Sequence, residues 1–336
     1  MNRKIHIDLL KVMAIIAVLV QHARPTLYYN DRISILAGFS VPLFMLIGGY
    51  NVYRSMEAKK KFDLKKSLIK ILIPYVIASF IYECVVQEVF SMGTMLHNLV
   101  QFTSSYPLYY VALYLQMLLI SPILFNVIKK CLSKSKKWLQ CILLIIFMAI
   151  ICCICYLTSN YTVMLDWRFW SSMLLGGPMF IFWVLGMLFA VGEQYVDSKA
   201  KNGIVIGISS IGIITYAAMT LTYTKDNLGS LFGNQGEFIT IIDLIYACSI
   251  FWFVKGIAYF IKKKEENVAC KIVTYVGKRT YYIFLYHIMF FILTAYEMTF
   301  PNLWVMRFVV FGAMLFGPLA AEFLLSKIGN LIRADK

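Results

Sequence analysis

The first apolar stretch of the chain, residues 7–25, contains three ionisable side chains at spacings that could support chemistry: Asp8, Lys11 and His22. An α-helix turns by about 100° per residue, so all three side chains fall on one narrow stripe of a helix. Ionisable groups inside a membrane usually face the protein interior or a water-filled cavity. We therefore expect this stripe to line the functional site.

His22 is the member of the stripe whose chemistry is most useful at neutral pH. An imidazole has an ordinary pKa of about 6.5, so it can take a proton from a hydroxyl group or carry an acyl group itself. Lys11 lies about 16 Å away along the helix axis, and its ammonium can reach the membrane surface. In the structural alternative, Asp8 and Lys11 form an ion pair at the helix end and His22 lies at the interface.

The composition predicts the elements that must position these side chains. Of the 336 residues, 60% are hydrophobic and only 15% are charged. A soluble domain of this size cannot bury so much apolar surface, whereas a membrane accommodates helices of about 20 apolar residues. We predict an all-α integral membrane protein, a single transmembrane domain over 1–336. Ten helices are expected, roughly at 7–23, 35–53, 68–90, 107–128, 138–158, 169–191, 203–223, 237–261, 280–297 and 303–326.

The positive charge supports a membrane topology rather than a nucleic-acid partner. The net charge is +15, but the lysines and arginines form short runs between apolar segments instead of a basic domain or tail. With ten spans, nearly all of these runs fall on the side of the N-terminus, which is the cytosolic side by the positive-inside rule. We therefore expect both termini in the cytosol and the protein in the cell (plasma) membrane.

The cysteines predict no metal site. There are eight, and no pair has metal-ligand spacing with histidines nearby. The cluster Cys152, Cys153 and Cys155 lies inside an apolar run and is interpreted as packing.

The Asp8–Lys11–His22 spacing resembles the first helix of the acyltransferase-3 family of integral membrane acyltransferases. Four further stretches resemble later helices of that family in the same order. They are VPLFMLIGGY at 41–50, KKSLIKILIPYVI at 65–77, YYVALYLQMLLISPILF at 109–125 and YYIFLYHIMFFI at 281–292. The third of these resembles the subgroup found in exopolysaccharide clusters, and the whole is similar to the stand-alone form of the family.

The resemblance implies a membrane O-acyltransferase that moves an acyl group, often acetyl, from cytosolic acyl-CoA to a hydroxyl of a cell-surface or exported glycan. His22 would be the general base or the acyl relay. Ammonium groups at the cytosolic rim suit the phosphates of the donor, and the predicted donor-binding residues are Lys11, Lys65, Lys66 and Lys70. The predicted supporting residues are Asp8, Glu83, Tyr110 and His287.

Two features of the predicted site stay open at this stage. The family normally has arginine at the positions of the four donor-binding lysines and serine at Gly48. Glu83 lies in the middle of a predicted span, where a carboxylate needs a partner. For Glu83, Asp243 and Glu322 alike, the alternatives are an interhelical hydrogen bond and a functional role, and one of the three is a candidate partner of Arg32, Arg54 or Arg168.

Two other functions are compatible with ten helices that carry inward-facing polar groups. One is a transporter or flippase for a glycan intermediate or a small solute. The other is a ligand-sensing membrane domain that has lost the chemistry. The partners expected for the enzyme are acyl-CoA, a glycan or lipid-linked saccharide acceptor, the lipid bilayer, and glycan-synthesis proteins or a second copy of the chain.

Overall fold

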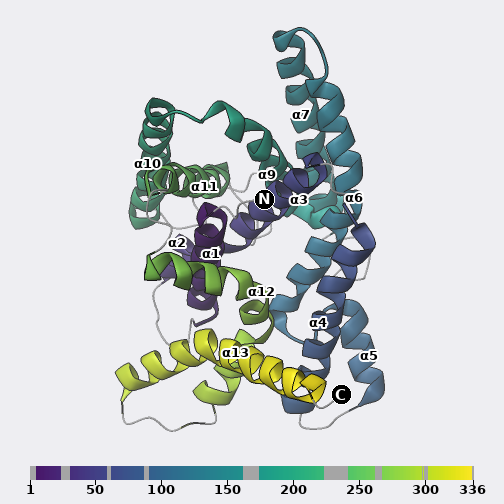
Figure 1. The fold of residues 1–336 in the computed structure, drawn as a ribbon, viewed down its shortest axis with the longest axis vertical. Coiled ribbons are helices and arrows are strands. Elements are labelled where there is room, and N and C mark those ends of the chain that lie inside the picture. Colours follow the sequence, from purple (N-terminus) through teal and green to yellow (C-terminus); the bar gives the residue numbers. More distant parts are fainter. Residues whose placement is uncertain are drawn as a thin grey trace. The chain divides into compact units, whose positions relative to one another are not determined.

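The computed structural model describes residues 5–23, 31–58, 62–86, 91–161, 174–222, 241–261, 267–296, 298 and 302–334, and these ranges contain helices and no strand (Figure 1). The α-helices are α1 (Ile5–Ala23), α2 (Asp31–Leu36), α3 (Ser40–Glu57), α4 (Leu64–Val85), α5 (Met92–Gln101), α6 (Tyr109–Leu132), α7 (Lys137–Tyr161), α9 (Phe180–Gly192), α10 (Lys199–Thr222), α11 (Ile241–Ile261), α12 (Val268–Ala295) and α13 (Leu303–Ala334). Short 3-10 helices are η1 (Tyr106–Leu108), η3 (Leu174–Met179) and η4 (Glu193–Tyr195).

Nine helical segments in the described ranges are long and apolar enough to cross a membrane. Their outward surfaces carry large apolar side chains, such as Ile145 on α7, Ile208 on α10 and Phe308 on α13, each more than 60% exposed. Such surfaces fit lipid rather than water. The prediction of an all-α, multi-pass membrane protein is confirmed, and the remaining predicted span, 280–297, falls on the 28-residue helix α12.

The helices form two compact units. The first contains the described residues of Met1–Ser40, Tyr75–Leu108 and Glu266–Lys336, and the second those of Val41–Pro74 and Tyr109–Glu265. The expectation of a single domain over 1–336 stays a prediction.

In the first unit, α1 and α12 pack in the same direction. Gly277 of α12 lies against Asp8 near the start of α1, so closely that an added Cβ would lie 2.9 Å from the Asp8 Cβ. Further along both helices, His287 lies against His22. Residue numbers therefore rise together along the two helices, as expected for the first and ninth of ten consecutive spans.

Helix α13 packs antiparallel to α12. Gly317 of α13 makes room for the ring of Phe290. Nearer the other end of the pair, Arg279 donates from Nε to Glu322 at 2.8 Å. Glu322 therefore has a cation as its partner, although that cation is not one of the three arginines predicted from the sequence.

In the second unit, glycines allow α3 and α9 to approach closely. A Cβ added at Gly49 would overlap the carbonyl oxygen of Trp183, and one added at Gly186 would overlap that of Leu46. A side chain at Gly48 would collide with the Trp183 indole, whose Nε1 donates to Ser121 Oγ at 2.9 Å. The serine that the family normally has in place of Gly48 would therefore displace the buried Trp183 in this chain.

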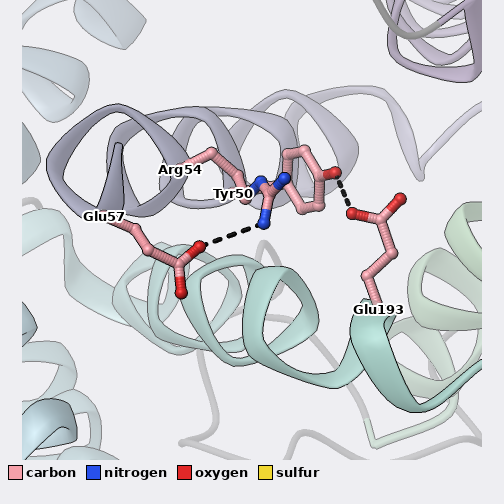
Figure 2. A network of polar contacts seen from close by, with 4 residues as sticks. All are labelled: Tyr50, Arg54, Glu57 and Glu193. Atoms are coloured by element: carbon pink, nitrogen blue, oxygen red, sulfur yellow. Dashed lines mark hydrogen bonds and ion pairs between the residues drawn. The ribbon is translucent and has the colours of Figure 1, made fainter. Parts of the chain in front are cut away.

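Polar contacts fasten the end of α3 in the same unit. Figure 2 shows Tyr50 donating its hydroxyl proton to Glu193 of η4, and Arg54 pairing with Glu57 at 3.0 Å. On α10 and α11, the Tyr216 hydroxyl donates to Asp243 at 2.8 Å. The partner that the structure shows for Arg54 is thus Glu57, and the one that it shows for Asp243 is Tyr216.

Candidate active site

The polar stripe of α1 faces the inside of the first unit. Asp8 is 2% exposed, whereas Ile16 on the same helix is 40% exposed. At about 100° per residue, Ile16 lies about 120° around the helix from His22. Lys11 and His22 are half-buried. Lys11 and His22 therefore point away from the surface that Ile16 presents to lipid, and Asp8 is buried.

His22 lies beside two other rings at the end of α1. Its ring centroid is 5.1 Å from that of His287 on α12, with a tilt of 50° between the planes. The ring of Tyr106, on η1, meets it edge-on at 6.0 Å. Residues far apart in the sequence thus bring two imidazoles and a phenol together, and each of these groups can hold or pass a proton.

His287 is fully buried and has a defined tautomer. Its Nδ1 atom lies 2.8 Å from the carbonyl oxygen of Phe284. Since a carbonyl oxygen only accepts hydrogen bonds, Nδ1 carries the proton and Nε2 of the neutral ring carries a lone pair. That Nε2 atom is buried and has no hydrogen-bond partner among the described residues.

Tyr82 of α4 holds the turn of α12 that carries His287. The Tyr82 hydroxyl donates to the carbonyl of Leu285 and accepts from the amide of Met289, both at 3.1 Å. In a regular helix these two backbone groups would bond to each other, and a side chain inserted between them is a recognised cause of a local bend. Tyr82 is 2% exposed, so this contact is protected from water.

Glu83, the next residue on α4, is bonded to α5. Asn98 donates from Nδ2 to Glu83 Oε1 at 2.8 Å, and Thr103 donates to the Asn98 side-chain oxygen at 3.1 Å. The interhelical hydrogen bond that the sequence left open for Glu83 is therefore observed, and a functional role of Glu83 stays a prediction. Glu83 therefore joins α4 to α5 in the segment that leads to Tyr106.

Within the first unit, the structure brings His22 and His287 together. Lys11 follows Asp8 by one turn on α1. Lys65, Lys66 and Lys70 are exposed on the first half of α4, which belongs to the second unit. Tyr110, on α6 of the second unit, is buried against Phe44 and Tyr114. In the described part of the chain, no group of three His, Cys, Asp or Glu side chains could hold a metal ion.

Comparison with known families decides the class of protein. The model of the acyltransferase-3 family, described as an acyltransferase domain, matches residues 4–327. The chain belongs to the acyltransferase-3 family. No curated protein and no solved structure matches it. The chain is therefore a membrane acyltransferase that uses an acyl donor, and family membership favours the enzyme over the transporter and the ligand-sensing domain.

Proposed function

We propose that this acyltransferase-3 protein transfers an acyl group, most simply acetyl, from cytosolic acyl-CoA to a hydroxyl of a cell-surface or exported glycan, in the plasma membrane. The observation that carries the proposal is the position of His22. It is half-buried, lies on the protein-facing stripe of α1, and contacts a second histidine with a free lone pair. A buried imidazole with this surrounding is suited to accept a hydroxyl proton.

His22 acts as the general base in this mechanism. One ring nitrogen takes the proton of the glycan hydroxyl while the hydroxyl oxygen attacks the carbonyl carbon of the thioester. The new C–O bond forms, the C–S bond breaks, and the proton passes from His22 to the departing thiolate. A base positioned in this way typically accelerates such a reaction by about 10²–10⁴-fold.

The length of the stripe suits a donor that enters from the cytosolic end of α1. Lys11 and His22 are separated by about 16 Å along the helix axis, so a long, thin pantetheine arm could join phosphates near Lys11 to a thioester near His22. The ammonium of Lys11 would pair with those phosphates. The roles of Lys65, Lys66 and Lys70 at the donor, and of exopolysaccharide as the acceptor, stay predictions.

Acyl transfer by purified protein tests the proposal. The protein in lipid nanodiscs is incubated with labelled acetyl-CoA and an oligosaccharide of N-acetylglucosamine, and both released CoA and acetylated sugar are measured by mass spectrometry. We expect the His22→Ala variant to lose about 10²-fold or more of the turnover, while His97→Ala, an exposed histidine on α5, keeps it. Unchanged turnover in His22→Ala would refute the role of His22.

A further inference from the structure

We infer that His287 is the positioning partner of His22: its Nε2 lone pair accepts a hydrogen bond from the ring of His22 when His22 holds the substrate proton. This inference rests on the proposed function and deepens it. A base that becomes an imidazolium has two N–H groups. One of them faces the reacting oxygen or sulfur, and the other requires an acceptor.

The Nε2 atom of His287 is in the right state to be that acceptor. Its Nδ1–H is committed to the carbonyl of Phe284 at 2.8 Å, which fixes the ring orientation and leaves the lone pair on Nε2. Buried polar atoms nearly always have a partner, yet this Nε2 has none within the described residues. A histidine kept only for packing would gain stability from a second hydrogen bond, so the free lone pair points to a use during turnover.

The distance between the two rings permits the contact. Their centroids are 5.1 Å apart, close enough for facing nitrogens to reach a hydrogen-bonding separation of about 2.7–3.2 Å. The ring of His22 makes no hydrogen bond to another described residue, so it can turn towards His287. His287 is fixed by comparison, because it is fully buried and its turn of α12 is held by Tyr82.

The carboxylates on these elements are poor alternatives as partners of His22. Asp8 is on the same helix but lies about 21 Å away along the axis. Glu83 accepts from Asn98 and joins α4 to α5. By contrast, the ring of His287 lies directly against that of His22, and the ring of Tyr106 lies somewhat further away.

A matched pair of substitutions separates positioning from packing. The amide of asparagine reaches the place of the His Nδ1, whereas the longer glutamine reaches that of Nε2. His287→Asn therefore keeps a donor to Phe284 and removes the acceptor, and His287→Gln keeps an acceptor near His22. Both are measured for kcat, for the KM of acetyl-CoA and for thermal stability, with His97→Asn as the exposed control.

We expect His287→Asn to lower kcat by about 10–100-fold, the effect of losing a hydrogen bond to a charged group, with the donor KM within about threefold. His287→Gln should recover at least part of that loss. The double variant His22→Ala/His287→Asn should be no slower than His22→Ala, because residues that act as a unit are non-additive.

Three results would overturn the inference. They are an unchanged kcat in His287→Asn, equal losses in the Asn and Gln variants, and multiplicative losses in the double variant. Failure of the proposed function gives a different pattern, because the original protein would then transfer no acetyl group to the glycan, and failure of the role of His22 would leave the turnover of His22→Ala unchanged. If His22→Ala is inactive while His287→Asn is normal, the function stands and only the inference falls.

Discussion

Removal of the Tyr82 hydroxyl is the perturbation whose effect on the candidate site is most specific. Tyr82 and Tyr75 are both buried on α4, two turns apart, and each donates its hydroxyl proton to a backbone carbonyl. The Tyr75 hydroxyl bonds to Leu99 at 2.7 Å and joins α4 to the end of α5. Only the Tyr82 hydroxyl enters the backbone of α12 beside His287. Tyr75→Phe is therefore a matched control for Tyr82→Phe.

The two substitutions should have similar effects on stability and different effects on rate. Leaving a backbone carbonyl without its donor costs about 1–3 kcal/mol when the carbonyl is shielded from water, and Tyr75→Phe does this at Leu99. In Tyr82→Phe, the carbonyl of Leu285 and the amide of Met289 both lose their partner and can bond to each other only if the turn straightens, which would move His287. A displacement of about 1 Å in a catalytic site can cost about 10²-fold in rate.

The assay measures thermal unfolding in detergent and kcat for acetyl transfer in the same preparations. We expect both variants to lose a few degrees of Tm, Tyr82→Phe to lose about 10–100-fold in kcat, and Tyr75→Phe to stay within about threefold of the original protein. Equal kcat losses in the two variants, or none in Tyr82→Phe, would refute the argument that Tyr82 positions His287.

Two further predictions concern helix packing and the donor. Gly186→Ala should destabilise the protein by about 1–3 kcal/mol or more, because its Cβ overlaps the carbonyl of Leu46. Gly207→Ala, with no atom within 4 Å of its Cβ, should cost nothing or stabilise by up to about 1 kcal/mol; comparable thermal unfolding of the two would contradict this. Lys11→Ala should raise the KM for acetyl-CoA about tenfold with little change in kcat, as expected for one lost phosphate contact, and an unchanged KM would remove Lys11 from the donor site.

Features that depend on the spacing of residues along one helix could be predicted from the sequence. The period of an α-helix was enough to place Asp8, Lys11 and His22 on one stripe, and in the structure Asp8 is buried and Lys11 and His22 are half-buried. Glycines in apolar runs are likewise typical of close helix contacts, which Gly49 and Gly186 make. In both cases the property depends on the residue itself and its neighbours along one helix.

The partners across helices could not be predicted in the same way. The insertion of Tyr82 into α12 depends on how two helices cross, and nothing in the sequence distinguishes this tyrosine from the other 21. The sequence left Glu83 with two alternatives, and only the fold selected Asn98. His287 was expected to have a supporting role, but its free Nε2 could not be foreseen, since that depends on the carbonyl of Phe284 and on the packing around the ring.

A structure of the protein with a non-transferable thioether analogue of acetyl-CoA tests the central claim most directly. We expect the carbonyl carbon of the analogue to lie close to His22, leaving room for an acceptor hydroxyl at about 3–3.5 Å, and its phosphates to lie at the Lys11 end of α1. An analogue bound with its carbonyl at the Lys11 end, about 16 Å from the imidazole, or on a surface remote from α1, would show that His22 is not the base.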